Sequence, residues 1–402
     1  MPGTSRGTRI TLDSYDPFDP AVIADPFPHY RLLQQEAPVY EVAKHGFFVL
    51  SRYDDVVAAA QDWEHFSTTW GPGPQRTESP VASILQSDPP QHTRLRSIIS
   101  KAFTPRAVRA CEPLVDAYAH DRIDAILERG QADWIDEFAI PIPVVVIAEM
   151  LGVPREDRAL FRKWSDDIVG AIAGRVDPRD SQREFNAYFS DVVEARQRDP
   201  RDDVITKLLR PNSDGEQLTL PEVISFCLSL LVAGNETTTG LLGNLIFELA
   251  KRPEAWRHLR EDPSLISSAV EESLRFDAPN QGLFRHTVKD IEIHGVVIPA
   301  DRKVLLLFGA AGRDPEHFER PDEFDIARSP NRHIAFGAGI HHCLGASLGR
   351  LEANTALRIA TERIAEIRLI DEAPPYVPVF FIRCPEHFRI AATASVARFV
   401  TR

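Results

Sequence analysis

The sequence is poor in cysteine, and its few cysteines are scattered. The 402 residues include four of them, Cys111, Cys227, Cys343 and Cys384, and no two form a C-x-x-C pair. Disulfide frameworks and iron–sulfur clusters use sets of cysteines at regular spacings. The distribution therefore argues against a fused iron–sulfur domain and fits a protein of a reducing compartment.

Long apolar segments and an excess of positive charge are also missing. No run approaches the ~20 apolar residues of a membrane helix, and residues 1–10 are polar, without the apolar core of a signal peptide. Acidic residues outnumber basic ones by 59 to 46, and the net charge of −13 argues against a nucleic-acid partner. We therefore expect a soluble, cytoplasmic protein that binds neither nucleic acid nor a membrane.

One cysteine lies in a distinctive glycine-rich segment, residues 333–352. Three glycines surround Cys343, and glycines allow a close approach of the backbone to a bulky group. After the cysteine, leucines recur at the three- to four-residue spacing of a helix that continues to Glu362. The thiol is thus predicted in a tight loop at a helix N-terminus, where free N–H groups and the helix dipole favour a thiolate.

The residues alone leave the chemistry of Cys343 open between a nucleophile, a zinc ligand, an iron ligand and a buried structural cysteine. A zinc site needs three or four ligands, but no second cysteine is near, and the adjacent His341 and His342 cannot easily both reach one ion with Cys343. A nucleophile needs a histidine and an orienting residue elsewhere in the chain, which the sequence does not exclude.

A second distinctive segment interrupts the longest predicted helix. A capping box at Thr219–Glu222 begins a helix expected to reach about Lys251, ~48 Å at ~1.5 Å per residue. Its middle is apolar on all sides except at Ser229, as in a buried helix, and is followed by Ala233-Gly234-Asn235-Glu236-Thr237-Thr238.

An acid and hydroxyls are costly in a buried helix and need a reason. Either Thr237 bonds back to the preceding turn and bends the helix, or Glu236 and Thr237 deliver protons. Ser229, Ala233 and Thr237 share one face, and the small side chains on it leave room beside a flat ligand.

Two shorter patterns carry little weight alone. Asp88, as a cap followed by two prolines, predicts the start of a helix with His92 and Arg96 on one face, a spacing also common in surface pairs. Glu272 and Arg275 have the i, i+3 spacing of an ordinary helical salt bridge. Residues 92–110 contain no acid but several further basic residues, Arg94, Lys101, Arg106 and Arg109.

Together, these segments resemble the cytochrome P450 monooxygenases. Every fixed position of the family's haem-binding loop is filled by Phe336-Gly337-x-Gly339-x-His341-x-Cys343-x-Gly345. The segment Ala233-Gly234-x-Glu236-Thr237-Thr238 resembles the family's oxygen-activation motif. The segment Asp88-Pro89-Pro90-x-His92-x-x-x-Arg96 resembles its propionate-binding helix, and Glu272-x-x-Arg275 resembles its structural Glu-x-x-Arg pair. The four motifs follow the family's order and spacing over nearly the whole chain.

The resemblance implies a mainly α fold with small β-sheets, in which residues 1–402 form a single domain with a long central helix over the haem. Residues 1–27 would form an N-terminal arm, and the glycine- and proline-rich loop 70–80 would cover the substrate pocket. The β-rich region would comprise about 37–50, 284–308 and 377–391, the last as a hairpin of 377–382 with 388–391. The family usually has Asn where Gly312 stands, a departure that affects only local packing.

The resemblance also implies roles for single residues. Cys343 would be the thiolate ligand of haem b iron, which pushes electron density toward O–O cleavage, and Glu236 and Thr237 would deliver protons. Glu272 and Arg275 would be structural. The haem propionates would be bound by His92, Arg96, Arg285 and His341. The alternative for Arg285 is an exposed arginine on a strand. Other haem contacts would be Ala233, Phe336, Gly337 and Gly345. Rough matching gives as substrate-pocket candidates Ser229, Val232, Ala233, Asn280, Gln281, Leu283 and Phe381.

The implied function is NAD(P)H-dependent monooxygenation, in which two electrons activate O2 and a mid-sized lipophilic small molecule is hydroxylated or otherwise oxidised. A separate iron–sulfur ferredoxin and its ferredoxin reductase would supply the electrons to a monomeric enzyme. The basic residues of 92–110, with Arg332 and Arg350, would dock this acidic donor. Two alternatives are a peroxygenase using H2O2, which would not need Glu236 and Thr237, and a non-catalytic haem sensor or carrier.

Overall fold

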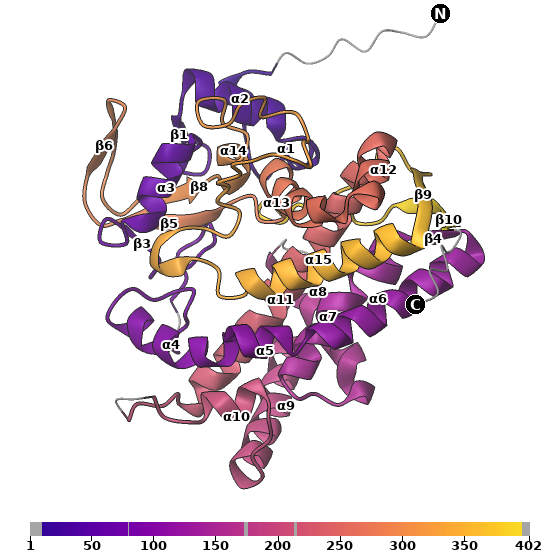
Figure 1. Cartoon of the computed structure of the whole chain (residues 1–402). Coiled ribbons are helices and arrows are strands. Elements are labelled where there is room, and N and C mark those ends of the chain that lie inside the picture. Colours follow the sequence, from indigo (N-terminus) through magenta and orange to yellow (C-terminus); the bar gives the residue numbers. More distant parts are fainter. Residues whose placement is uncertain (1–9, 79, 173–175, 213–214, 396–402) are drawn as a thin grey trace, which may run out of the picture.

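The computed structural model describes residues 10–78, 80–172, 176–212 and 215–395, and it is mainly helical with small sheets, as expected (Figure 1). The first nine residues of the predicted N-terminal arm lie outside the described residues. Within these ranges, no helix is both long and apolar enough to cross a membrane.

The largest sheet has five strands in the order β1-β2-β8-β5-β3. Every residue of β2 and β8, which pair in parallel, is buried, so the centre of the sheet is apolar on both faces. A hairpin of β6 (Ile291–Ile293) and β7 (Val296–Ile298) follows β5 at the edge of this region (Figure 1). The five strands of the sheet are β1 (Val39–Val42), β2 (Phe47–Leu50), β3 (Phe66–Ser67), β5 (Leu283–Thr287) and β8 (Lys303–Leu306). The strands predicted within 37–50 and 284–308 are confirmed.

The N-terminal segment packs on this sheet. Tyr15, Val22, Tyr30 and Leu33 form one apolar cluster with side chains of β1, β2, β5 and β8. The arm is therefore part of the folded core from Tyr15 onward. Its helices are a 3-10 turn (Leu12–Ser14), α1 (Pro20–Ala24) and α2 (Phe27–Glu36), and α3 (Tyr53–Gln61) follows β2.

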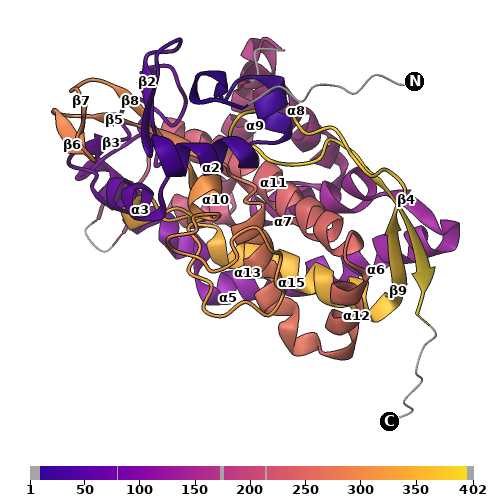
Figure 2. The same ribbon diagram turned by 90° about the horizontal axis from the view of Figure 1, so that it is seen from above.

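The longest helix, α11 (Leu220–Ala250), passes through the middle of the helical part in both views (Figures 1 and 2). Its predicted capping box is present, because Glu222 Oε2 accepts a hydrogen bond from the Thr219 N–H at 2.8 Å and Thr219 Oγ1 accepts one from the Glu222 N–H. Helices α7, α8, α9, α13 and α15 pack around it.

The other helices are mostly amphipathic and bury one face against this centre. They are α4 (Gln91–Ile99), α5 (Pro105–Arg109), α6 (Glu112–Arg129), a π-helical turn (Ile135–Ala139), α7 (Pro141–Met150), α8 (Arg158–Ile172), α9 (Arg179–Arg198), α10 (Val204–Leu208), α12 (Pro253–Glu261), α13 (Ile266–Phe276), α14 (Phe308–Ala311) and α15 (Ala346–Arg363). Short 3-10 helices occupy Ser100–Phe103, Arg155–Asp157, Pro263–Leu265 and Gly339–His341.

The prediction of a C-terminal hairpin was wrong in its pairing. Strand β10 (Arg389–Ala394) pairs with β9 (Ile364–Leu369) and β4 (Gln131–Asp133), and not with residues 377–382. The segment 376–385 instead folds on itself through isolated bridges between residues 376 and 385 and between 379 and 382. Prolines cannot donate to a strand ladder, and four lie in this part of the chain, Pro374, Pro375, Pro378 and Pro385.

A buried ion pair joins α13 to the irregular chain that leads to the cysteine loop. Glu272 and Arg275 are fully buried and bond through two contacts of 2.8 Å. Arg275 also donates to three backbone carbonyls, and Glu272 accepts from a backbone N–H and two further side chains, so that no charge is left uncompensated. A Cβ added to Gly312 would lie 2.4 Å from the Arg275 carbonyl oxygen, so the usual Asn would not fit there. The partners are Gly312, Pro321, Glu323, Asp325, Arg328 and Asn331.

We expect the substitution Arg275→Leu to lower the free energy of unfolding by about 3–5 kcal/mol, because it leaves the Glu272 carboxylate and three carbonyls buried without this partner. A matched control is Arg257→Leu, which removes an exposed Arg at the same spacing from Glu254 in α12 and should change stability by less than about 0.5 kcal/mol. Urea unfolding measures both. Equal losses in the two variants would show that the buried pair has no special structural weight.

Candidate active site

The cysteine loop is a tight turn that leads into α15. The Cys343 N–H donates to the Phe336 carbonyl at 2.8 Å and closes the loop. Gly337 and Gly339 have φ angles of 71° and 68°, in the left-handed region that glycine tolerates best. A Cβ on Gly339 would lie 2.7 Å from the Ala60 carbonyl oxygen. The predicted glycine pattern therefore serves both backbone conformation and close contact with α3.

Cys343 differs from the other three cysteines because its side chain is exposed and theirs are buried. Low-polarity surroundings nevertheless raise the pKa of its thiol, and the N–H groups of Gly345 and Ala346 and the charges of Arg96 and Arg350 act in the opposite direction. The expected effect of the helix start is thus present, but desolvation outweighs it. A bound metal ion would itself stabilise the thiolate.

Four basic side chains predicted to bind an anionic group come together beside this loop. The rings of His92 on α4 and His341 lie 4.4 Å apart between centroids. Arg96, one turn after His92, donates to the His342 carbonyl oxygen at 2.9 Å. Arg285 on β5 is also close, because its charge, together with burial, lowers the pKa of His341 to about 3.

This basic cluster, defined by His92, Arg96, Arg285 and His341, has no carboxylate within ion-pair distance among the described residues, although the charge of Asp88 acts on His92 and Arg285. None of the four forms an ion pair with another described residue, and the buried His92 Nε2 has no hydrogen-bond partner there. Arg285 is 5% exposed and, among the described residues, donates to the carbonyl of its neighbour Phe284 alone, and burial lowers its pKa to about 10. Uncompensated buried charge is unfavourable. The residues therefore fit a ligand that brings its own carboxylates, as the haem propionates do.

Asp88 does not cap α4 as predicted. Its carboxylate instead accepts hydrogen bonds from Ser67 Oγ at 2.5 Å and from the N–H and hydroxyl of Thr68 at 3.1 and 2.9 Å. The N-cap position is Pro90, which makes no side-chain cap. Thr68 Oγ1 also lies 3.4 Å from His341 Nε2. Residues 67–68 thus connect the start of α4 to the cysteine loop, which the sequence did not indicate.

One face of α11 is open at the point where the sequence motif occurs. Ala233 is exposed although it lies in the middle of this central helix, and Ser229 and Thr237, one turn to each side, are partly exposed. Solvent-accessible space therefore lies against the face with small side chains. Thr237 Oγ1 donates to the Ala233 carbonyl at 2.7 Å, so the back-bonding considered from the sequence is present at the same residue.

Glu236 turns toward α8. Its Oε1 accepts a hydrogen bond from Ser165 Oγ at 2.9 Å, a partner 71 residues away that the sequence did not reveal. Burial raises the pKa of the Glu236 carboxyl, the nearby Asp166 raises it further, and the bond from Ser165 lowers it. The carboxyl thus keeps its proton to a higher pH than an ordinary glutamate.

The remaining pocket candidates lie on α11, in residues 280–283 and at Phe381. Backbone contacts join 280–283 to Phe381, since the Gln281 N–H donates to the Phe381 carbonyl at 2.9 Å. Val232 on α11 is partly exposed, as are Asn280, Leu283 and Phe381.

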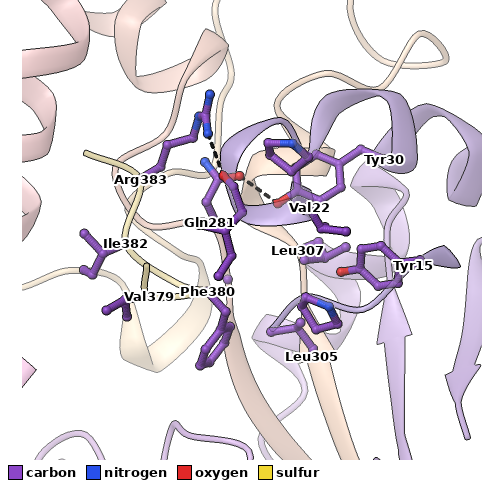
Figure 3. A pocket seen from close by; sticks show the side chains of 14 residues that line it. Tyr15, Val22, Tyr30, Gln281, Leu305, Leu307, Val379, Phe380, Ile382 and Arg383 are labelled. Atoms are coloured by element: carbon purple, nitrogen blue, oxygen red, sulfur yellow. Dashed lines mark hydrogen bonds between the residues drawn. The ribbon is translucent and has the colours of Figure 1, made fainter. Parts of the chain in front are cut away.

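Gln281 has a different position from the one expected. It is 3% exposed, and its amide is used by Tyr30, whose hydroxyl donates to Oε1 at 2.7 Å, and by the Ala278 carbonyl, which accepts from Nε2 at 2.6 Å. Figure 3 shows it in a small cavity beside Tyr30 and Arg383, under the N-terminal helices. We therefore correct the prediction and do not keep Gln281 as a substrate contact.

The basic residues expected on the surface near the thiolate divide into two groups. Arg94 is paired with Glu222, and Arg350 is paired with Glu271 at 2.7 Å and lies over the Phe336 ring. Although burial acts in the opposite direction, the bonds from His333 and Arg350 lower the pKa of Glu271 to about 2. These two arginines are thus not free for docking. The exposed residues without an ion pair among the described residues are Lys101, Arg106, Arg109 and Arg332.

Comparison with known proteins agrees with this geometry. Residues 153–360 match the family described as Cytochrome P450. The chain is 37% identical to cytochrome P450 107B1 of Saccharopolyspora erythraea (88% of this chain and 91% of that protein) and 38% identical to the vitamin D(3) 25-hydroxylase of Pseudonocardia autotrophica (87% and 89%). It superposes on cytochrome P450 CYP109Q5 from Chondromyces apiculatus with a TM-score of 0.88 at 40% identity, over 96% of this chain and all of the other. With an exposed thiol, an uncompensated basic cluster and these matches, the chain belongs to the cytochrome P450 family of monooxygenases.

Proposed function

We propose that this chain binds haem b through the Cys343 thiolate and hydroxylates a mid-sized lipophilic molecule. The observation that carries the proposal is the basic cluster, four cationic or titratable side chains without a carboxylate beside the one exposed cysteine. When bound, haem supplies the two-electron activation of dioxygen and the transfer of one oxygen atom to the substrate. The propionates would be held by His92, Arg96, Arg285 and His341.

Residues of α11 would manage protons at this site. Thr237 would hold a proton at Oγ1, beside the open face of the helix, and would pass it toward the reacting oxygen. Glu236 would supply the next proton from its carboxyl, which its raised pKa keeps protonated closer to neutral pH. Ser165 would orient that carboxyl through its 2.9 Å bond.

The substrate would lie against the face of α11 that carries Ser229, Val232 and Ala233. Leu283 and Phe381 would add apolar contacts, and Asn280 a polar one. Small side chains at Ser229 and Ala233 leave room for a bulky ligand, and one related protein is named as a vitamin D(3) 25-hydroxylase. We infer the class of substrate from these features and not its identity.

The electrons would come from NAD(P)H through a ferredoxin reductase and a small acidic ferredoxin. The docking surface would be the exposed residues Lys101, Arg106, Arg109 and Arg332, near the start of α5 and the cysteine loop. On a chain of net charge −13, such a local basic patch would guide an acidic partner by its own field.

The haem ligand is tested by the substitution Cys343→His. We expect the reduced, carbon-monoxide-bound wild-type protein to show the red-shifted Soret band of a thiolate ligand, and the variant to lose it, because imidazole donates less charge to iron. Cys384→Ser, which alters a buried cysteine, is the control and should keep the band. Persistence of the band in Cys343→His would exclude Cys343 as the ligand.

Proton delivery is tested by the substitution Thr237→Ala. Positioned proton donors contribute ~10²–10⁴-fold, so the variant should still consume reductant and oxygen but release mostly hydrogen peroxide. Thr239→Ala removes the same hydroxyl two residues later on α11, where it faces the Ala139 carbonyl, and should remain coupled. If Thr237→Ala forms as much product per reductant as wild type, Thr237 has no part in proton delivery.

The donor surface is tested by reversing charge at Arg106 and Arg109. We expect Arg106→Glu and Arg109→Glu to slow reduction of the haem by an acidic ferredoxin and leave substrate binding intact. Wild-type reduction should also slow as salt rises, since the Debye length falls from ~10 Å at 0.1 M to ~3 Å at 1 M. Arg179→Glu, which reverses an exposed charge at the first residue of α9, is the control. A rate of haem reduction that changes neither with salt nor with these charge reversals would contradict this docking site.

A further inference from the structure

Lys303, the first residue of β8, is a buried cation that the proposed reaction does not use. Its side chain is only 7% exposed. Nζ donates to the carbonyl oxygens of Trp70, Gly71 and Gly73 at 2.9, 2.8 and 2.9 Å. A lysine ammonium has three N–H donors, so all three are used. No described carboxylate pairs with it, and its charge is met by these carbonyl dipoles and by the ring of Phe284, whose centroid lies 5.9 Å from Nζ.

The segment that Lys303 holds has few other attachments to the sheet. The Phe284 N–H on β5 donates to the Pro72 carbonyl at 2.9 Å. The Trp70 ring stacks on His286 of β5, with centroids 4.1 Å apart and planes inclined by 4°. Gly71, with φ of 81°, allows the turn. The chain from Trp70 to Gly73 is irregular, so its position depends on these side-chain and backbone contacts.

The same segment continues directly into the basic cluster. Two residues before Trp70, Thr68 contacts His341 Nε2 at 3.4 Å and bonds to the Asp88 carboxylate. The Asp88 carbonyl in turn accepts from the His92 N–H at 2.9 Å, at the start of α4. One short stretch of chain thus connects Lys303 to two of the four side chains proposed to bind the propionates.

We propose that Lys303 is a positioning residue for the haem-propionate site. Its ammonium fixes Trp70–Gly73 against β5 and β8, and this segment fixes Thr68 and Asp88, and through them His341 and His92. The inference rests on the proposed haem site for its second step, while the first step concerns the protein alone. It assigns a role to a residue outside all the family motifs in the sequence.

The three-carbonyl contact depends on the protonation of Lys303. Burial, and then the charge of Arg285 on the neighbouring strand, lower its pKa to about 8. Other charged or titratable groups in this region are His286 on β5, Asp88 and Asp301. A neutral amine has only two N–H donors, so one carbonyl loses its partner as the pH rises through about 8. The pKa of about 8 belongs to Lys303 in the folded protein, so the ammonium loses its proton while the protein is still folded.

The test compares the wild-type holoprotein with Lys303→Met, which keeps the length of the side chain without donors, and with Lys303→Arg, which restores charge and donors. Lys289→Met, an exposed lysine just after β5, is the control. Amide hydrogen exchange, expressed as protection factors for residues 68–77, reports on the segment. The rate of haem transfer to excess apomyoglobin reports on the propionate site.

We expect Lys303→Met to lower the protection factors of residues 68–77 by about tenfold or more and to speed haem release by a similar factor. Lys303→Arg should recover much of both, and the control should match wild type. In wild type, the protection factors of this segment should fall between pH 7 and pH 9. In Lys303→Met, they should be the same at pH 7 and pH 9. Thr68→Val combined with Lys303→Met should speed haem release less than additively, because both act along one connection.

Unchanged protection in Lys303→Met would overturn the proposal at its first step. A loosened segment with an unchanged rate of haem release would overturn its second step and leave the proposed function intact. If Lys303→Met does not fold, the comparison of wild type with Lys303→Arg and the wild-type pH series still decide the matter, since equal protection at pH 7 and pH 9 would contradict the role of the ammonium. A wild-type chain that binds no haem would instead refute the proposed function, and the exchange data would test the first step alone.

Discussion

The structure depends on a cluster of basic side chains that forms no ion pair with a carboxylate among the described residues. His92, Arg96, Arg285 and His341 come from α4, β5 and the cysteine loop, and folding brings them together where their pKa values are all lowered. Such a cluster opposes folding by itself. A dianionic cofactor would relieve that cost, so binding and folding should support one another. The exposed thiol of Cys343 beside this cluster gives the cofactor its second point of attachment.

The rest of the fold keeps these groups in place from two sides. On the side of α13, the buried Glu272–Arg275 pair holds the irregular chain before the cysteine loop. On the side of the sheet, Lys303 holds the segment that contacts His341 and Asp88. Both devices use a buried cation that donates to backbone carbonyls of irregular chain. Irregular segments can therefore lie at the site with defined positions although they lack secondary structure of their own.

The sequence predicted the parts of this structure that depend on local pattern. The capping box of α11, the hairpin at 39–50 and the glycine-framed cysteine are set by neighbouring residues, and the structure has them where expected. Contacts between distant segments were not predictable. Ser165 meets Glu236 across 71 residues and Lys303 meets Gly71 across 232, and no spacing rule connects such pairs.

Errors arose for the same reason. Asp88 was predicted as a helix cap because of the prolines after it, but the distant Ser67 and Thr68 occupy its carboxylate. Gln281 was assigned to the substrate pocket by rough matching to the family, but Tyr30 from the N-terminal segment binds its amide. The C-terminal strand found its partners in β4 and β9. In each case a tertiary contact outweighed the local pattern.

The most direct test of this account is a crystal structure of the haem-bound protein with iron located by anomalous scattering. The account predicts one iron atom within bonding distance of Cys343 Sγ, below the face of α11 that carries Ala233. Both propionates should contact the basic cluster, with His92 and Arg285 each within hydrogen-bond distance of a carboxylate oxygen. Propionates directed to solvent, or iron bound by a residue other than Cys343, would contradict it.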